Sequence, residues 1–458
     1  MFTNKHSYFK DDFDVVFDQW NRIQKDFINF PLAVSIFRRS LLEDRLSKIN
    51  PKTITRVDRS KEIEYRWKKK LKSRVTIFNL FSPRKISLYI LLIRRIIGIY
   101  FFNKYSFSVI SYVHRTPQLE NSLKVFFKKK VNINTCYLDK SYISLISSIV
   151  LTVSLKKKDY KAIIKNGMCS IFSLENESEV LLSIERRLRM AISIVKFSLK
   201  FFRVSLVVTH DSHSQVGMVI AYAAKELNIK VVEVAHGYTQ DESLLTVFPL
   251  YADYEVVWSD DVQEMIRKKL SGTCQEDFYL QKIISFSQPL LSVSRHKFIK
   301  QNEIDKNILI LIPAIKAYNS TDKASTLDKF EKLAEQLNDK KYKVFIRPHP
   351  SDFNSIKLSK DFEHLKSYCH FDLNQTAELH TYNIVVGAMS SLLFEAAING
   401  LYVFQLVDYP GVIIEGARPV NFIDCLDRIN DRELSAKNHI DPFRTDNFNN
   451  FLFSIGFD

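Results

Sequence analysis

Residues 204–237 read VSLVVTHDSHSQVGMVIAYAAKELNIKVVEVAHG, and this stretch decides the fold. The apolar, β-branched runs at 204–208 and 230–235 predict two buried strands, and residues 214–227 predict a helix between them. A helix that connects two buried strands is typical of a parallel sheet. Polar residues that follow such strands lie at the carboxyl-terminal edge of the sheet, where ligands bind.

The same alternation continues on both sides of this unit. We expect a third strand at 252–258, followed by a helix capped by Asp260. Further strands are expected at 107–113, 131–136, 307–312, 343–346, 383–386 and 401–406. Further helices are expected at 181–200, 326–338 and 391–399, the last ended by Gly400. Because residues 271–305 lack a strong period, we interpret them as a crossing between two doubly wound halves.

The composition restricts the kind of nucleotide site that the chain offers. Among 458 residues there are only 10 glycines, where average usage predicts roughly 32. Neither GxGxxG nor GxxxxGK[ST] occurs, so the two commonest glycine-rich phosphate loops are excluded. The five cysteines lie far apart without a CxxC pair, so neither a zinc site nor a disulfide framework is indicated. The start of the chain lacks the pattern of a secretory signal, and we expect a cytoplasmic protein.

Basic clusters and apolar stretches indicate contact with a membrane surface. The net charge is +15, and triple-lysine clusters lie at 68–70, 128–130 and 156–158. The apolar stretch 86–102 is interrupted by two arginines, and 141–155 is shorter than the ~20 residues of a spanning helix. We expect a protein peripheral on the inner membrane, attracted through these clusters. A solvated basic face is the alternative, and no nucleic-acid-binding motif accompanies the charge.

Two motifs in the second half predict an anion site. In Arg347-Pro348-His349-Pro350, which follows a strand, the prolines stiffen the loop that carries a guanidinium and an imidazole. In the stretch GAMSSLLFE at 387–395, Ser390 is a natural N-cap and Ser391 lies in the first helical turn. A helix start binds anions through its N–H groups. Glu395 stands one turn further along, where we expect its carboxylate to accept hydrogen bonds from ribose hydroxyl groups. A rigid surface turn and an ordinary capped helix are the alternatives.

Two residues at strand exits of the first half are candidates for a general base. His236 follows the strand at 230–235, and Gly237 after it permits a tight turn out of the strand. An imidazole can act as a general base near neutral pH. Asp211, flanked by His210 and His213, follows the preceding strand and is a second base or an orienting group. Structural roles, as a strand-end histidine and a helix cap, are the alternatives. No regular ligand spacing indicates a metal.

In combination, these motifs resemble a known group of enzymes. The order HG, RPHP, SSxxxEAxxxG over residues 204–407 resembles bacterial surface-polysaccharide glycosyltransferases of GT-B fold, which build capsule and lipopolysaccharide. Similar patterns occur in the capsule transferases that use Kdo, the polysialyltransferases and the CDP-glycerol glycerophosphotransferases. The resemblance implies that His349, Ser390 and Ser391 contact the phosphates of a nucleotide donor and that His236 is the base. It further implies a nucleotide-sugar donor, with a CMP sugar as the first candidate, and a saccharide or lipid-linked acceptor.

We therefore expect an α/β protein with two Rossmann-like domains facing a cleft. The expected regions are a helical basic N-terminal region (1–105), an acceptor domain (106–285), a nucleotide-sugar domain (286–430) and a tail that packs back on the N-terminal domain (431–458). We expect neither cofactor nor metal. Three other functions stay open, namely a polyol-phosphate transferase of teichoic-acid type, a UDP-sugar 2-epimerase and a non-catalytic partner in polysaccharide export or assembly.

Overall fold

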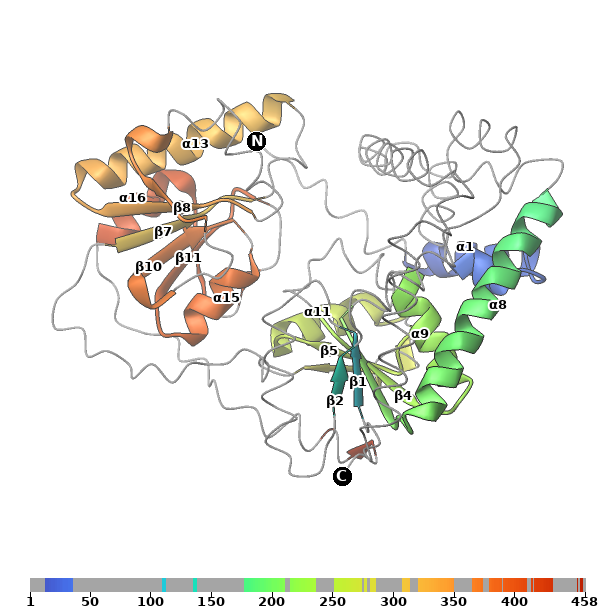
Figure 1. Cartoon of the computed structure of the whole chain (residues 1–458). Coiled ribbons are helices and arrows are strands. Elements are labelled where there is room, and N and C mark those ends of the chain that lie inside the picture. The colour runs from blue at the N-terminus through green and yellow to red at the C-terminus, as the bar shows by residue number, and fades with distance from the viewer. Residues whose placement is uncertain are drawn as a thin grey trace, which may run out of the picture.

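The computed structural model contains two parallel sheets with helices packed on them (Figure 1). The structure describes residues 13–35, 109–112, 135–137, 177–210, 215–235, 251–273, 276–277, 281–285, 307–313, 320–349, 365–373, 379–388, 390–409, 413–414, 416–430, 451 and 454–455. The triple-lysine clusters and the two long apolar stretches lie outside these residues. Within the described ranges, no helix is both long enough and apolar enough to cross a membrane.

The first sheet has six parallel strands in the order β2-β1-β3-β4-β5-β6. The strands are β1 (Val109–Tyr112), β2 (Thr135–Tyr137), β3 (Leu206–Thr209), β4 (Lys230–Val234), β5 (Tyr254–Val257) and β6 (Ile283–Ser285). The strand order reverses between β1 and β3, so the crevice of this sheet opens at their carboxyl ends. The residues that follow β3 are therefore next to a natural ligand position.

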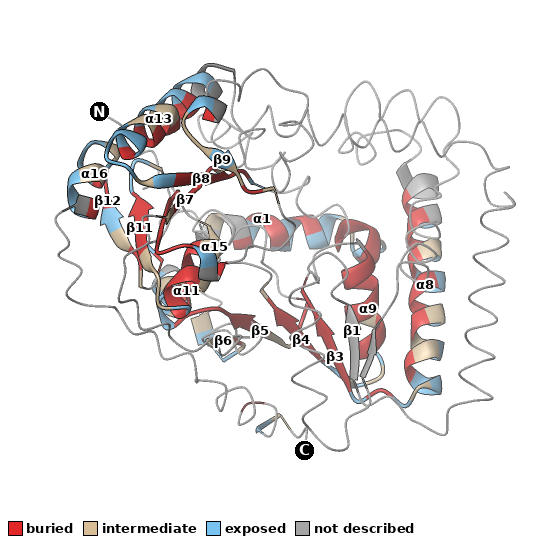
Figure 2. Ribbon diagram, turned by 60° about the vertical axis from the view of Figure 1, so that its left-hand side comes forward, coloured by how far each residue is buried: buried red, intermediate tan, exposed pale blue. Residues whose placement is uncertain are grey.

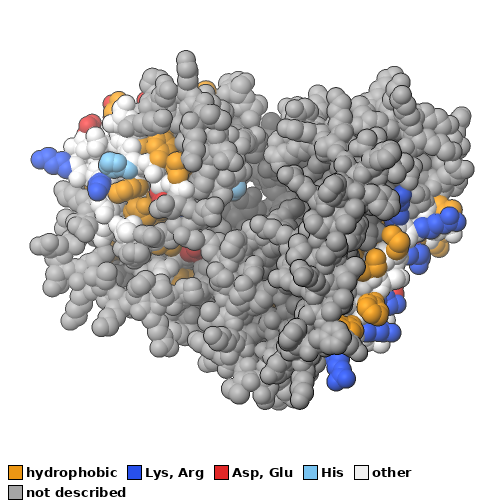
Figure 3. Space-filling view, viewed as in Figure 1, with side chains coloured by type: hydrophobic (Ala, Val, Ile, Leu, Met, Phe, Trp, Pro, Cys, Tyr) orange, Lys and Arg blue, Asp and Glu red, His pale blue; other side chains and the backbone are white. Residues whose placement is uncertain are grey.

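Helix α9 (Gln215–Lys225) packs on one face of this sheet, α8 (Glu177–Phe201) packs against α9, and α1 (Phe13–Asp26) contributes to the same apolar cluster. The apolar residues of α8 recur every three or four positions, and Leu188, Ala191 and Val195 are buried against this core (Figure 2). The opposite side of α8 presents basic and hydrophobic side chains to the surface (Figure 3).

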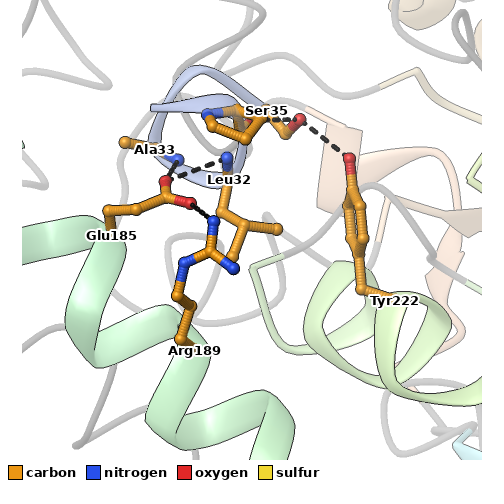
Figure 4. A network of polar contacts seen from close by, with 7 residues as sticks. Leu32, Ala33, Ser35, Glu185, Arg189 and Tyr222 are labelled. Atoms are coloured by element: carbon orange, nitrogen blue, oxygen red, sulfur yellow. Dashed lines mark hydrogen bonds and ion pairs between the residues drawn. The ribbon is translucent and has the colours of Figure 1, made fainter. Parts of the chain in front are cut away.

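A buried carboxylate joins α8 to the N-terminal region (Figure 4). The backbone N–H groups of Leu32 and Ala33 both donate to Glu185 Oε2 at 3.0 Å. Arg189, one turn along α8, donates to the other oxygen at 3.0 Å. Glu185 is almost fully buried, and such a charge is stable only when its oxygens are hydrogen-bonded. These bonds hold residues 31–35 against α8.

The second sheet has the order β12-β11-β10-β7-β8-β9, again with all strands parallel. Its strands are β7 (Asn307–Leu311), β8 (Lys343–Arg347), β9 (His370–Phe371), β10 (Ile384–Gly387), β11 (Tyr402–Leu406) and β12 (Arg418–Val420). If the six strands are numbered 1 to 6 in chain order from β7, their order across the sheet, starting at β9, is 3-2-1-4-5-6. This is the arrangement of a dinucleotide-binding sheet. Its crevice lies at the carboxyl ends of β7 and β10.

Successive side chains of β7 point to opposite faces of this sheet, and each face packs against different helices. Ile308 and Ile310 belong to the core formed with α13 (Ser320–Asp339) and α16 (Phe422–Asn430). Leu309 and Leu311 face the other way, into the core that contains α15 (Ser391–Ile398). The short α15 therefore lies on the opposite face from α13 and α16, as Figure 1 shows.

The two sheets share one apolar cluster. Helix α11 (Asp260–Leu270) follows β5, and its buried residues Val262 and Ile266 belong to the same cluster as the residues of α15. The rings of Trp258 and Phe394 are 6.1 Å apart, and α11 lies beside α15 in Figure 2. Near the C-terminus, the ring of Phe451 packs edge-on against Tyr254 of β5 at 5.2 Å.

The predicted α/β class with two doubly wound parallel sheets is confirmed, and two local predictions are corrected. The helix after β5 is capped by Ser259 rather than Asp260, because the Ser259 hydroxyl accepts from Val262 N–H while Asp260 already lies in the first turn. Residues 271–305 are not entirely a crossing, since β6 at 283–285 adds a sixth strand to the first sheet. This strand is too short to show a hydrophobic period.

Candidate functional site

The candidate site is at the carboxyl-terminal edge of the second sheet, where β7 and β10 end. Leu311 and Gly387 are register partners, and the chain then passes from β10 into α15. A Cβ atom at Gly387 would lie 2.7 Å from Leu311 Cβ and 3.0 Å from its carbonyl oxygen. Any other residue at position 387 would push β7 and β10 apart, so glycine allows the two strands to approach closely at the point where the chain leaves the sheet.

The first turn of α15 has the geometry of an anion-binding helix start. Ser390 is extended, with φ −151° and ψ 138°, and its hydroxyl accepts from Leu392 N–H at 3.3 Å. It is therefore the N-cap that the sequence predicts, with Ser391 as the first helical residue. Both serines are half-buried at the crevice. The N–H groups and the positive end of the helix dipole favour negative charge there.

Glu395 lies one turn into α15 and has an unusual proton affinity. Burial raises the pKa of Glu395 to about 7, while the nearby Arg347 guanidinium acts to lower it. A carboxyl group with this pKa is partly protonated at neutral pH, so it both donates and accepts hydrogen bonds. The sequence predicted Glu395 only as an acceptor.

Arg347 is held by residues that the sequence motifs did not indicate. It is the last residue of β8, is buried, and donates from Nη1 to Asp372 Oδ2 at 2.9 Å. The Tyr382 hydroxyl donates to the same carboxylate oxygen at 3.3 Å. Burial, followed by the negative charge of Asp372, raises the pKa of Tyr382 to about 12. The guanidinium predicted to bind phosphate therefore already has a buried counter-charge.

His349 lies two residues beyond the end of β8 and is exposed. Between them, Pro348 is buried, so the stiff exit loop is fixed to the sheet while the imidazole reaches solvent. Strand β8 neighbours β7, with Leu311 and Arg347 as register partners. His349 is thus at the same edge of the sheet as the start of α15.

The two candidate bases lie just outside the described residues. Asp211 follows Thr209 and His210, both buried at the end of β3, and His236 follows Ala235 after β4. Thr209 is the register partner of a residue near the end of β4, so both exits lie at one edge of the first sheet. The positions of these two side chains, and their roles, stay predictions.

A pair of buried carboxyl groups on the first sheet was not predicted. Glu233 of β4 and Glu255 of β5 are register partners, and both are buried. Burial raises the pKa of Glu255 well above its ordinary value, and the charge of Glu233 raises it further. No described residue hydrogen-bonds to Glu255 Oε2. In the sequence, VVEVA and YEVVW carried no signal beyond strand propensity, because the pairing depends on register.

The described residues contain no group of three or more His, Cys, Asp or Glu side chains suited to hold a metal ion. The histidines and the aspartate at 210–213 and the histidine at 236 fall mostly outside this part of the chain. That the site needs no metal therefore stays a prediction.

Comparisons with known proteins give distant structural similarities. No protein-family model matches the sequence, and no curated protein matches it. The UDP-GlcNAc 2-epimerase of Neisseria meningitidis, solved with UDP-GlcNAc, is 13% identical and matches 76% of this chain and 99% of its own with a TM-score of 0.45. The wall teichoic acid polymerase TagF is 10% identical and matches 80% of this chain and 92% of its own, with a TM-score of 0.37. A glycosyltransferase of Rickettsia africae is 12% identical, with coverages of 71% and 88% and a TM-score of 0.38. At these values the similarities establish neither a family nor an activity.

Proposed function

We propose that this protein is a glycosyltransferase that moves a sugar from a nucleotide-activated donor to a growing bacterial surface polysaccharide or a lipid-linked saccharide. The observation that carries the proposal is the start of α15 at the crevice of the second sheet, capped by Ser390. This combination of a strand-order reversal and a helix start favours the phosphates of a nucleotide. The resemblance of the motifs makes a CMP sugar the first candidate donor.

In the proposed reaction, the acceptor hydroxyl attacks the anomeric carbon of the donor sugar. His236 or Asp211, at the edge of the first sheet, takes the proton from that hydroxyl as the new C–O bond forms. The bond between the anomeric carbon and the phosphate oxygen breaks, and the nucleotide leaves with the electron pair. His349 and the N–H groups at Ser390 and Ser391 stabilise the negative charge that grows on the leaving phosphate. Because these groups supply positive potential, we propose that no metal is required.

The contacts of Arg347 refine the roles within the donor site. Its ion pair with Asp372 offsets much of its charge, so we assign the main phosphate contacts to α15 and His349. Arg347 then holds the β8 exit through Asp372, and its positive charge limits the rise in the pKa of Glu395. Partly protonated at neutral pH, Glu395 has the capacity to bind ribose hydroxyl groups as donor or acceptor.

The acceptor side of the proposal involves the membrane. We propose that the protein works at the cytoplasmic face of the inner membrane, where lipid-linked saccharides are presented. The support is the positive charge of the first 160 residues, with lysine clusters at 68–70, 128–130 and 156–158. Each basic residue near an anionic surface contributes about 1 kcal/mol of attraction.

His349→Ala tests the donor site. Loss of a group that stabilises the leaving phosphate lowers sugar transfer by about 10²-fold or more. The matched control is His370→Ala, which removes another exposed imidazole from the same sheet. Transfer by H349A within about threefold of the wild-type rate would refute the role of His349.

The choice of substrates separates the other functions. A polyol-phosphate transferase turns over CDP-glycerol but no nucleotide sugar, and an epimerase converts UDP-GlcNAc without any acceptor. A non-catalytic assembly partner turns over none of these and binds no nucleotide. Release of CMP from a CMP sugar only in the presence of a saccharide acceptor is the result that supports the proposal.

A further inference from the structure

The outer face of α8 exposes large apolar side chains. Met190 is 51% exposed and Phe197 is 67% exposed, and Leu182 and Phe201 are exposed as well. Half of the large hydrophobic residues exposed in the described part of the chain are on this one helix. Phe197 and Phe201, one turn apart, stack with ring centroids 6.1 Å apart. An apolar surface of this kind marks a contact site.

Basic side chains accompany this apolar surface. The cations at its surface are Arg186, Arg189, Lys200 and Arg203, and the half-buried Arg187 and Lys196 flank them. The only acidic residue between 180 and 203 is Glu185, which is buried and accepts from Leu32 N–H, Ala33 N–H and Arg189. Figure 3 shows the basic and hydrophobic side chains together along α8. Arg189 pairs with Glu185, and Lys196 pairs with Glu226 of the neighbouring α9 region, but the cations outnumber these carboxylates. The surface therefore combines aromatic groups with an excess of positive charge.

Helical periodicity places these residues in one continuous stripe. Arg186, Met190, Phe197 and Phe201 are separated by steps of four and seven residues. At about 100° of rotation per residue, each step is close to a whole number of turns, so the four residues lie on one side of the helix. From Leu182 to Phe201 the stripe is about 28 Å long at 1.5 Å per residue. Leu188 and Val195, on the other side, are buried in the core of the first sheet. The helix is firmly packed on one face while the other is presented outward.

We propose that the outer face of α8 binds the surface of an anionic lipid bilayer. A helix that lies in a membrane interface has basic residues on its polar side and Phe or Leu side chains that enter the headgroup region. The alternation of cations with exposed apolar groups fits anionic headgroups above acyl chains, whereas protein interfaces are depleted of charge at their centre. These residues differ from the triple-lysine clusters in the sequence and belong to the first sheet's helices rather than to the nucleotide site of the second sheet, so the proposal extends the membrane part of the proposed function.

The test is flotation of the full-length protein with lipid vesicles. One set of vesicles contains phosphatidylcholine alone, and the other contains phosphatidylcholine with phosphatidylglycerol. We expect binding to the anionic vesicles, and we expect the double variant Met190→Ser/Phe197→Ser to reduce the partition coefficient about tenfold or more. The control is Ile423→Ser, which removes an 89% exposed apolar side chain from α16 and leaves binding within about twofold.

A second variant removes charge from the same face and leaves the apolar groups in place. Arg186→Gln/Lys200→Gln lowers binding to anionic vesicles, and added salt lowers wild-type binding in the same direction. Unchanged binding by both double variants overturns the proposal, as does equal binding to the two kinds of vesicle. The proposal is also overturned if the wild type does not bind vesicles but forms oligomers in analytical ultracentrifugation, and M190S/F197S is monomeric. In that case the outer face of α8 binds a second copy of the chain.

Nucleotide binding is measured on the same samples. A variant that loses vesicle binding but still binds CMP or UDP as the wild type does supports a membrane role separate from the donor site. If no nucleotide binds to any sample, the proposed function fails while the vesicle result stands by itself. The unfolding midpoints of the variants check that these exposed substitutions leave the fold intact.

Discussion

Replacing Glu395 with glutamine is expected to change how the stability of the protein depends on pH. The pKa of Glu395 is raised from its ordinary 4.5 to about 7 in the folded chain, mainly by burial. The folded state therefore binds the proton more tightly than the unfolded state does. The stability that this group contributes is complete below about pH 4.5 and is lost as the pH rises through about 7.

The size of the loss follows from the two pKa values. Each tenfold change in proton affinity is worth about 1.4 kcal/mol. A rise from 4.5 to about 7 then corresponds to about 3 kcal/mol of unfolding free energy at neutral pH and above. Glutamine has the shape of the protonated carboxyl group and does not ionise. We expect E395Q to match the wild type in acid and to exceed its stability at neutral pH.

Urea denaturation at several pH values, followed by circular dichroism, measures this difference. The control is Glu264→Gln, which changes an exposed carboxylate on α11 and leaves the pH dependence of unfolding as it is in the wild type. If the wild type and E395Q lose stability in parallel between about pH 4.5 and 8, the Glu395 carboxyl is not buried as described and the reasoning is refuted.

Three further substitutions test the two sheets. Gly387→Ala is expected to cost about 1–3 kcal/mol of unfolding free energy, because the new Cβ meets Leu311 at 2.7 Å; an unchanged denaturation midpoint would contradict this. Ser390→Ala removes the cap of α15 and is expected to cost about 1 kcal/mol, which thermal unfolding measures, and an unaltered unfolding midpoint argues against the cap. Glu255→Gln is expected to stabilise the protein at neutral pH but not in acid, since burial and Glu233 raise the pKa of Glu255; destabilisation at neutral pH in urea titrations would count against the paired carboxyls.

The sequence predicted the central strands because their chemistry is local. The runs that became β3, β4, β7 and β10 are continuous, β-branched and bounded by polar residues, which is typical of strands buried on both faces. The cap at Ser390 was predictable for the same reason, since a cap depends on residues within one helical turn. Arg347, His349, Ser390 and Glu395 lie in the second half and share the edge of its sheet.

What the sequence did not predict depends on contacts between distant segments. Strands β6 and β9 have only three and two residues, too few for any period to be visible. The partner of Arg347 is Asp372, which is 25 residues away and follows β9. Glu233 and Glu255 meet only because β4 and β5 pair in one particular register. None of these contacts leaves a signal in a single stretch of sequence.

The central claim is that a nucleotide binds at the start of α15, and a thermal-shift panel tests it most directly. The unfolding temperature is measured with and without CMP, CDP or UDP, both for the wild type and for a Ser390→Ala/Ser391→Ala variant. A ligand at about 100 times its dissociation constant stabilises the folded state by about 2.7 kcal/mol, which raises the unfolding temperature clearly. We predict such a rise for at least one nucleotide with the wild type and a loss of it in the variant. No rise with any nucleotide, or the same rise in both proteins, would contradict the claim.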